Sequence, residues 1–168
     1  MVTKLDKTAE NVVQLLKERG LILSTAESCT GGLISAEITA VSGSSDVFGF
    51  GFVTYANEAK TKLLGVKEDT LATVGAVSEE TAKQMADGAR RVSGADIAVS
   101  VTGIAGPTGG TPDKPVGTVY IGFSSAEKTY AVRYLFGGRG FPDAKDSREA
   151  IRCETALNAL DTIIREIT

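Results

Sequence analysis

Apolar residues recur along this chain at two spacings, one helical and one strand-like, and together they predict its elements. Apolar positions three and four residues apart predict helices over residues 8–19, 33–39, 58–64 and 79–93, and from about 146 to the end. Alternating or continuous apolar runs predict strands over 21–27, 48–55, 97–102, 116–124 and 128–135. The last two strands are joined by a short turn, which predicts an antiparallel hairpin.

The order of these elements predicts an α/β protein with three layers, in which helices cover both faces of a mixed sheet. The run 97–102 is almost wholly apolar, as is typical of a strand buried on both faces. The sequence shows no internal repeat and no Gly/Pro/Ser-rich linker between domains. At 168 residues, the chain is therefore expected to form a single domain over 1–168.

Composition narrows the classes of partner. Net charge is −3, and no block of basic residues interleaved with aromatic residues occurs, so a nucleic-acid partner is not expected. Charges near the N-terminus and Gly or Pro inside the longer uncharged runs predict no signal peptide and no membrane partner, hence a cytoplasmic protein. Two cysteines, Cys29 and Cys153, are too few for a disulfide framework and match no zinc spacing.

The chain contains no histidine, which changes the range of chemistry open to it. Ser-His-Asp and Cys-His catalysis are excluded, and the commonest metal ligand is missing. If a hydroxyl group is activated, its proton must pass to a lysine, a tyrosine or a carboxylate.

A hydroxyl stands at a sharp turn between the first strand and the following helix, at Ser28 in Glu27-Ser28-Cys29-Thr30-Gly31-Gly32. A helix start offers unpaired backbone N–H groups that can hold a phosphate or the oxyanion of an acyl-transfer intermediate. Alternatively, Ser28 or Thr30 merely caps the helix, because Ser and Thr are preferred caps.

Lys60 is the candidate amine. With Asn57 as the expected N-cap, it falls at the third helical position, where the helix dipole disfavours the charged form. A lysine with an ordinary pKa near 10.4 needs a downward shift of roughly 3 units to act as a base at neutral pH, so burial or other cations must supply most of it. The alternative is a solvated surface lysine.

Two further features suggest an anionic ligand. The loop over 102–115 carries three of the four prolines and several glycines, and such a loop after a buried strand can close backbone amides on a phosphate or can simply cross the surface. Arg148 and Arg152 lie one helical turn apart near the start of the last helix. They can meet an anion or form surface ion pairs.

Four motifs in this order resemble the CinA C-terminal domain family, the nicotinamide mononucleotide deamidases or PncC amidohydrolases: residues 26–32 (AESCTGG), 52–60 (FVTYANEAK), 75–78 (GAVS) and 100–107 (SVTGIAGP). The resemblance implies a three-layer α/β/α fold with a mixed sheet, anticodon-binding-domain-like. Larger CinA proteins carry an additional N-terminal domain, and the present chain resembles the stand-alone form.

The resemblance also implies roles for individual residues. Ser28 is the implied nucleophile and Lys60 the base, with Tyr55 and Thr102 assisting and Arg148 contributing to the site. Arg139 and Arg152 remain alternatives to Arg148, because the approach to the last helix is longer than the family's usual Gly-Asp-Arg turn. The implied substrate-binding residues are Cys29, Thr30, Gly31, Gly103, Gly106 and Arg152.

The implied reaction is hydrolysis of the carboxamide of nicotinamide mononucleotide to nicotinic acid mononucleotide and ammonia, with no metal or organic cofactor. A homo-oligomer is expected. Two rival hypotheses remain open: Cys29 as the nucleophile, and a non-catalytic nucleotide-binding or competence-related regulatory module.

Overall fold

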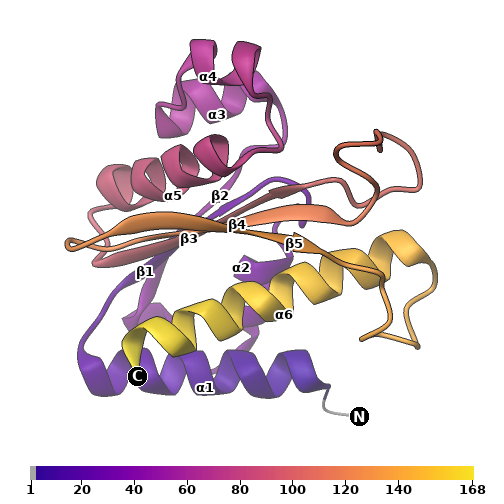
Figure 1. Ribbon diagram of the computed structural model, residues 1–168. Coiled ribbons are helices and arrows are strands. Elements are labelled where there is room, and N and C mark those ends of the chain that lie inside the picture. Colours follow the sequence, from indigo (N-terminus) through magenta and orange to yellow (C-terminus); the bar gives the residue numbers. More distant parts are fainter. Residues whose placement is uncertain (1–2) are drawn as a thin grey trace.

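A computed structural model describes residues 3–168 as a five-stranded mixed sheet between two layers of helices (Figure 1). The strand order is β2-β1-β3-β4-β5. β1 pairs in parallel with both β2 and β3, whereas β4 is antiparallel to β3 and to β5. The bounds are β1 Leu23–Glu27, β2 Phe48–Val53, β3 Ile97–Gly103, β4 Thr118–Ser124 and β5 Thr129–Leu135.

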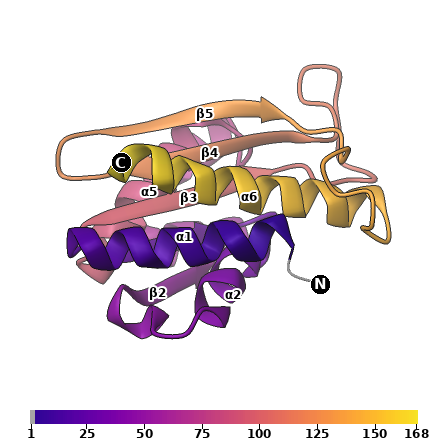
Figure 2. The same cartoon turned by 90° about the horizontal axis from the view of Figure 1, so that it is seen from below.

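The helices divide between the two faces of this sheet. One face is covered by α1 (Lys4–Arg19), α2 (Leu33–Ala40) and α6 (Ser147–Ile167), and a short 3-10 turn, η1 (Ser44–Asp46), follows α2. Figure 2, which views the sheet from this face, shows α1 and α6 running side by side in front of the strands, with α2 next to β2. The other face carries α3 (Asn57–Leu64), α4 (Glu68–Thr73) and α5 (Glu79–Ser93). The predicted three-layer arrangement with a mixed sheet is confirmed.

Apolar side chains fill both interlayer spaces. The larger core joins Val99, Val101 and Ile121 of the sheet to α1 and α6, which contribute residues such as Leu16 and Leu160. The smaller core, on the α5 side, joins residues of β1 and β3 to α3 and α5: Ala26, Ala98, Leu64, Val66, Met85 and Ala89. β1 and β3 are thus buried on both faces, which confirms the prediction made for β3 from the apolar run over 97–102.

Several boundaries differ from the predictions. α1 begins at Lys4 rather than residue 8, because Thr3 and Asp6 form a capping box. α4 was not predicted; its six residues are too few to show a helical period. β2 ends at Val53 rather than Tyr55. The Thr54 amide still donates to the Glu27 carbonyl oxygen of β1, at 2.9 Å, and the backbone leaves the sheet beyond this hydrogen bond.

The parallel strands β1 and β3 end at the same edge of the sheet, and this edge gathers the candidate residues. The segment that follows β1 is tied to β3 by the Ser28 amide, which donates to the Val101 carbonyl oxygen at 3.0 Å. The loop after β3 reaches the start of α6, where Arg148 donates to the Gly106 carbonyl oxygen. The crevice beyond the carboxyl ends of parallel strands is where α/β proteins commonly bind ligands.

Candidate active site

The structure brings the predicted hydroxyl and amine into contact. Ser28 follows the last residue of β1, and Lys60 comes from α3; Lys60 Nζ lies 3.0 Å from Ser28 Oγ. Only 8% of Ser28 and 1% of Lys60 is exposed to solvent. The alternative of a solvated surface lysine is therefore wrong.

The surroundings of Lys60 favour a neutral amine. Its Nζ also donates to the carbonyl oxygens of Thr54 and Tyr55, at 2.8 and 3.1 Å, and its hydrogen-bond partners include no carboxylate. Burial lowers the pKa of Lys60 from its ordinary value, because desolvation penalises the charged form. A lowered pKa is what a lysine base requires.

The predicted capping of α3 is wrong. The N-cap is Ala56, and neither this residue nor Asn57 makes a side-chain capping hydrogen bond there. Lys60 accordingly lies at the fourth helical position, not the third. Burial is the main cause of the lowered pKa.

The turn after β1 is organised by Glu27, whose carboxylate lies against the start of α2. It accepts hydrogen bonds from the amides of Gly32, Ile34 and Ser35. Neither Ser28 nor Thr30 caps the helix, since the N-cap position is Gly32 and Glu27 supplies the acceptor. The expectation that these helix-start amides would face a ligand anion is also wrong, because Glu27 already occupies them.

Two other amides of the turn are not taken up by Glu27 or by the backbone. The Gly31 amide donates to the Ser28 carbonyl oxygen at 3.1 Å. Over residues 3–168, by contrast, the amides of Cys29 and Thr30 donate to no backbone acceptor and to no side chain of another residue; the Cys29 amide lies against the thiol of its own residue. They directly follow Ser28 and are the candidate oxyanion donors.

A cavity of about 290 Å³ lies beside this turn. Arg148 spans it: Nη1 donates to the Gly106 carbonyl oxygen at 2.6 Å, and Nη2 donates to the Tyr55 hydroxyl at 3.3 Å. The lining residues are Cys29, Tyr55, Gly103, Ile104, Ala105, Gly106, Thr108, Gly109 and Arg148. The structure thus brings Tyr55, Arg148 and the predicted glycine loop together around one space.

The three candidates for the site arginine lie in different surroundings. Arg152 Nη2 donates to the Thr30 carbonyl oxygen at 2.6 Å, so it supports the Ser28 turn. Arg139 lines a different cavity, next to Leu135 and Glu154. Arg148 alone of the three lines the cavity beside Cys29 and Tyr55.

Comparison with known proteins identifies the family. A sequence model described as the CinA C-terminal domain matches residues 5–167. The chain belongs to this family. A putative competence-damage inducible protein of Caldanaerobacter subterraneus is 50% identical over 160 residues, which are 95% of this chain and 37% of that relative. The chain therefore spans little more than a third of the length of such curated relatives.

Solved structures of CinA proteins agree with the fold. The competence/damage inducible protein CihA of Agrobacterium tumefaciens is 43% identical, with a TM-score of 0.89 over 97% of this chain and 95% of that one. A CinA superfamily protein from Klebsiella pneumoniae is 32% identical, with a TM-score of 0.88 over 98% of both chains. The predicted membership of the CinA family is confirmed.

In this CinA chain, Thr102 is placed differently from the expectation, and the surroundings of Cys29 bear on the rival hypothesis that it is the nucleophile. Thr102 is almost fully buried, and its Oγ1 donates to the Ala76 carbonyl oxygen at 2.7 Å, so it anchors the segment before α5. Cys29 lines the cavity, but burial raises the pKa of its thiol to about 12. A thiol with that pKa stays protonated at neutral pH, which disfavours Cys29 as the nucleophile.

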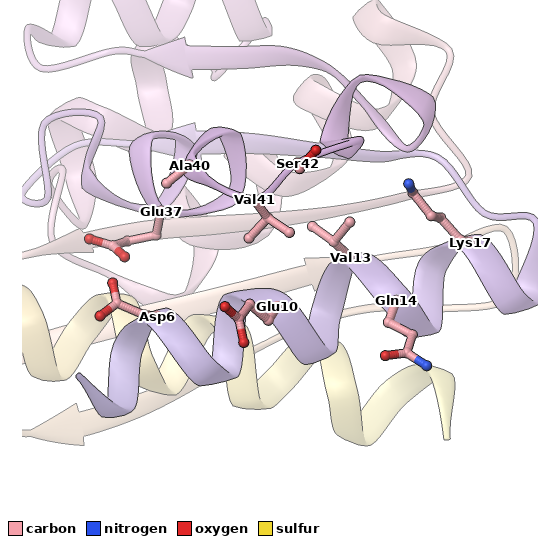
Figure 3. Close-up of a pocket in the computed structure, with 9 residues that line it drawn as sticks. All are labelled: Asp6, Glu10, Val13, Gln14, Lys17, Glu37, Ala40, Val41 and Ser42. Atoms are coloured by element: carbon pink, nitrogen blue, oxygen red, sulfur yellow. The ribbon is translucent and has the colours of Figure 1, made fainter. Parts of the chain in front are cut away.

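A larger cavity of about 600 Å³ lies between α1 and α2, away from these residues (Figure 3). Its wall carries the carboxylates of Asp6, Glu10 and Glu37, and burial and the nearby Asp6 raise the pKa of Glu37. None of the predicted site residues lines it. Cavity size is thus a poorer guide in this CinA chain than the Ser28–Lys60 contact.

No group of three or more Cys, Asp or Glu side chains within residues 3–168 is placed to hold a metal ion. No helix of the described residues is long and apolar enough to cross a membrane.

The role of Glu27 was missed in the sequence, although a signal was present. A charged residue stands at the end of an otherwise uncharged strand, immediately before Ser28. The carbonyl groups of Thr54 and Tyr55 were also missed, since backbone acceptors leave no mark in the sequence. The role of Glu27 becomes visible only once α2 is placed over it, and that of the carbonyl groups only once α3 is packed against the segment after β2.

Proposed function

We propose that this CinA-family chain is an amidohydrolase that hydrolyses the carboxamide of nicotinamide mononucleotide through an acyl-enzyme on Ser28. The observation that carries the proposal is the 3.0 Å contact between Lys60 Nζ and Ser28 Oγ, with the amine buried among neutral acceptors. In a chain without histidine, this is an amine within proton-transfer reach of a hydroxyl. The substrate comes from the family resemblance.

In the first half-reaction, neutral Lys60 takes the proton of Ser28, and Ser28 Oγ bonds to the carboxamide carbon. The negative charge moves to the carboxamide oxygen, which accepts hydrogen bonds from the amides of Cys29 and Thr30 in this proposal. The carbon–nitrogen bond then breaks, Lys60 returns the proton to the leaving nitrogen, and ammonia departs. An ester of nicotinic acid mononucleotide remains on Ser28.

In the second half-reaction, water replaces ammonia. Lys60 takes a proton from the water, whose oxygen bonds to the ester carbon, and the same two amides bind the charged oxygen. The ester bond to Ser28 breaks, and its oxygen recovers a proton from Lys60. Nicotinic acid mononucleotide leaves with its carboxyl group ionised.

Arg148 and the loop 103–110 are proposed to bind the substrate phosphate. The present partners of Arg148 are a carbonyl oxygen and a phenol, both neutral acceptors. A phosphate accepts stronger, charge-assisted hydrogen bonds from a guanidinium, so it would replace them. Nicotinamide riboside, which lacks the phosphate, should then be a far poorer substrate; equal turnover of the two compounds would remove this binding assignment.

The decisive experiment measures ammonia release from nicotinamide mononucleotide by the purified chain, Ser28→Ala and Ser125→Ala. Ser125 is a matched control, because its hydroxyl contacts only the exposed turn between β4 and β5. We expect turnover by wild type and Ser125→Ala, and a loss of about 10⁴-fold or more in Ser28→Ala. Turnover retained by Ser28→Ala, or nucleotide binding by wild type without ammonia release, contradicts the proposal.

The thiol alternative is tested with the same assay. If Cys29 were the nucleophile, Cys29→Ala would abolish ammonia release. If Ser28 is the nucleophile, turnover persists in Cys29→Ala, because the substitution keeps the backbone amide of residue 29.

A further inference from the structure

We infer that Glu27 is a positioning residue: its buried carboxylate fixes the 28–32 turn so that the amides of Cys29 and Thr30 face the reacting carbonyl oxygen. The inference rests on the proposed amidase function and adds a residue to it. Glu27 touches neither Ser28 Oγ nor Lys60 Nζ through a hydrogen bond, so it acts through the turn.

The carboxylate is fully enclosed and fully used. Glu27 has no exposed surface, and both of its side-chain oxygens accept hydrogen bonds. Besides the three helix-start amides, the donors are Thr30 Oγ1 at 2.6 Å and Ser35 Oγ at 2.7 Å. All five donors belong to residues 30–35, so one side chain binds the turn to the start of α2.

The Thr30 peptide is held from two directions. Its side chain donates to Glu27, and its carbonyl oxygen accepts from Arg152 Nη2 at 2.6 Å. Gly31 and Gly32 follow with φ of 62° and 99°, values that glycine adopts readily and other residues do not. The turn would otherwise be free to bend at these glycines, and the contacts of Glu27 and Arg152 remove that freedom.

The backbone of Glu27 is also connected to Lys60, through the segment that follows β2. Its carbonyl oxygen accepts the Thr54 amide at 2.9 Å, and the next two carbonyl oxygens along that segment, of Thr54 and Tyr55, hold Lys60 Nζ. The same residue therefore connects the segment that carries the candidate oxyanion donors to the segment that carries the acceptors of Lys60.

A purely structural cap and a positioning residue predict different kinetics. Loss of a cap lowers stability but leaves kcat per folded molecule near wild type. Loss of positioning weakens binding of the oxyanion, which exists only after attack, so kcat falls while KM changes little.

The test compares Glu27→Gln with Glu166→Gln. Glu166 is a matched control at the opposite end of the sheet, where it accepts from Tyr130 and Lys128. In Glu27→Gln one oxygen becomes an amide nitrogen that cannot accept the turn's donors. We expect kcat to fall about 10- to 100-fold and KM to stay within about threefold of wild type. This loss of kcat is smaller than the ~10²–10³-fold that follows outright removal of an oxyanion donor, because the two amides are still present. Glu166→Gln should melt earlier but keep its kcat.

A second variant covers the case in which Glu27→Gln does not fold. Thr30→Val keeps the carboxylate and removes only the Thr30 Oγ1 hydrogen bond, and kcat should fall about three- to tenfold. Wild-type kcat in either folded variant overturns the inference.

A readout without the nucleotide separates this inference from the proposed function. A fluorophosphonate probe is attacked by Ser28 Oγ, which bonds to phosphorus as fluoride leaves and Lys60 takes the proton; the developing oxyanion needs the same amides. Slower labelling of Glu27→Gln than of wild type, by the same factor as kcat, supports positioning, and equal labelling overturns it. If wild type neither labels nor hydrolyses, the proposed function fails, and the inference fails with it.

Discussion

Two fully buried ionisable side chains flank Ser28, and their surroundings are opposite in kind. Glu27 precedes Ser28 and receives five hydrogen bonds from amides and hydroxyls. Lys60 contacts Ser28 Oγ and donates to two carbonyl oxygens. Among its partners in the described residues, neither side chain has an ion of opposite charge.

The difference in hydrogen-bond partners distinguishes a charged side chain that stabilises the structure, Glu27, from a side chain suited to proton transfer, Lys60. Helix-start amides carry partial positive charge and suit an anion, so Glu27 is satisfied where it lies. Lys60 has neutral acceptors only, and burial lowers its pKa. Burial alone therefore does not mark a catalytic group; the character of the hydrogen-bond partners does.

For substitutions of these two side chains, the largest expected effect is on catalysis, from Lys60→Met. Methionine fills a similar volume but cannot accept the proton of Ser28. We expect kcat for ammonia release to fall by about 10²–10⁴-fold, the usual contribution of a general base, while the fold is kept. Steady-state kinetics with circular dichroism checks both; near-wild-type kcat would show that another group takes the proton.

Next in size is the loss of stability in Glu27→Ala. The substitution leaves three amides and two hydroxyls without their acceptor in the interior, and hydrogen bonds to charged groups contribute about 1.5–3 kcal/mol each. Because some donors will find water, we expect the free energy of unfolding in urea to fall by roughly 3–5 kcal/mol. A loss below about 1 kcal/mol would contradict the claim that the Glu27 carboxylate stabilises the fold.

The contrast between the two side chains also explains what the sequence could predict. The apolar periods place β1, β3, α5 and α6, because their buried faces are long enough to show the period. The hydroxyl at Ser28 and the amine at Lys60 were found from a turn pattern, the absence of histidine and a family resemblance.

The remaining features depend on pairing between distant segments. Glu27 looks like any charged residue near a turn until α2 is placed over it. The acceptors of Lys60 are carbonyl groups of the segment after β2, which any sequence would supply. Arg148 could not be chosen over Arg139 and Arg152 before the start of α6 was brought to the loop after β3.

A third expectation concerns the pH dependence of stability. The native pKa of Lys60 is lowered, whereas in the unfolded chain it returns to about 10.5. Between these two values the unfolded state holds one more proton than the native state, so the contribution of Lys60 to stability rises with pH, by at most about 1.4 kcal/mol per pH unit. Above 10.5 both states are neutral and the rise ends.

Urea unfolding of wild type and Lys60→Met at pH 7, 8 and 9 measures this contribution. Other titrating groups are shared by the two proteins and largely cancel in the difference. Wild type should gain stability relative to Lys60→Met as pH rises within the window set by the lowered pKa. A difference that falls with pH would mean that the native state prefers the charged amine.

The smallest expected effect compares the starts of the two helices. α2 begins against the carboxylate of Glu27, whereas α3, which carries Lys60, begins without any side-chain capping bond. Asn57→Ala should therefore change the free energy of unfolding by less than about 0.5 kcal/mol, where a true cap contributes about 1. Asp146→Ala is the matched control, because the Asp146 side chain accepts the Glu149 amide at 2.8 Å and caps α6. If Asn57→Ala lowers the free energy of unfolding as much as Asp146→Ala does, Asn57 caps α3. The start of the helix that carries Lys60 is then more stable than its hydrogen bonds indicate.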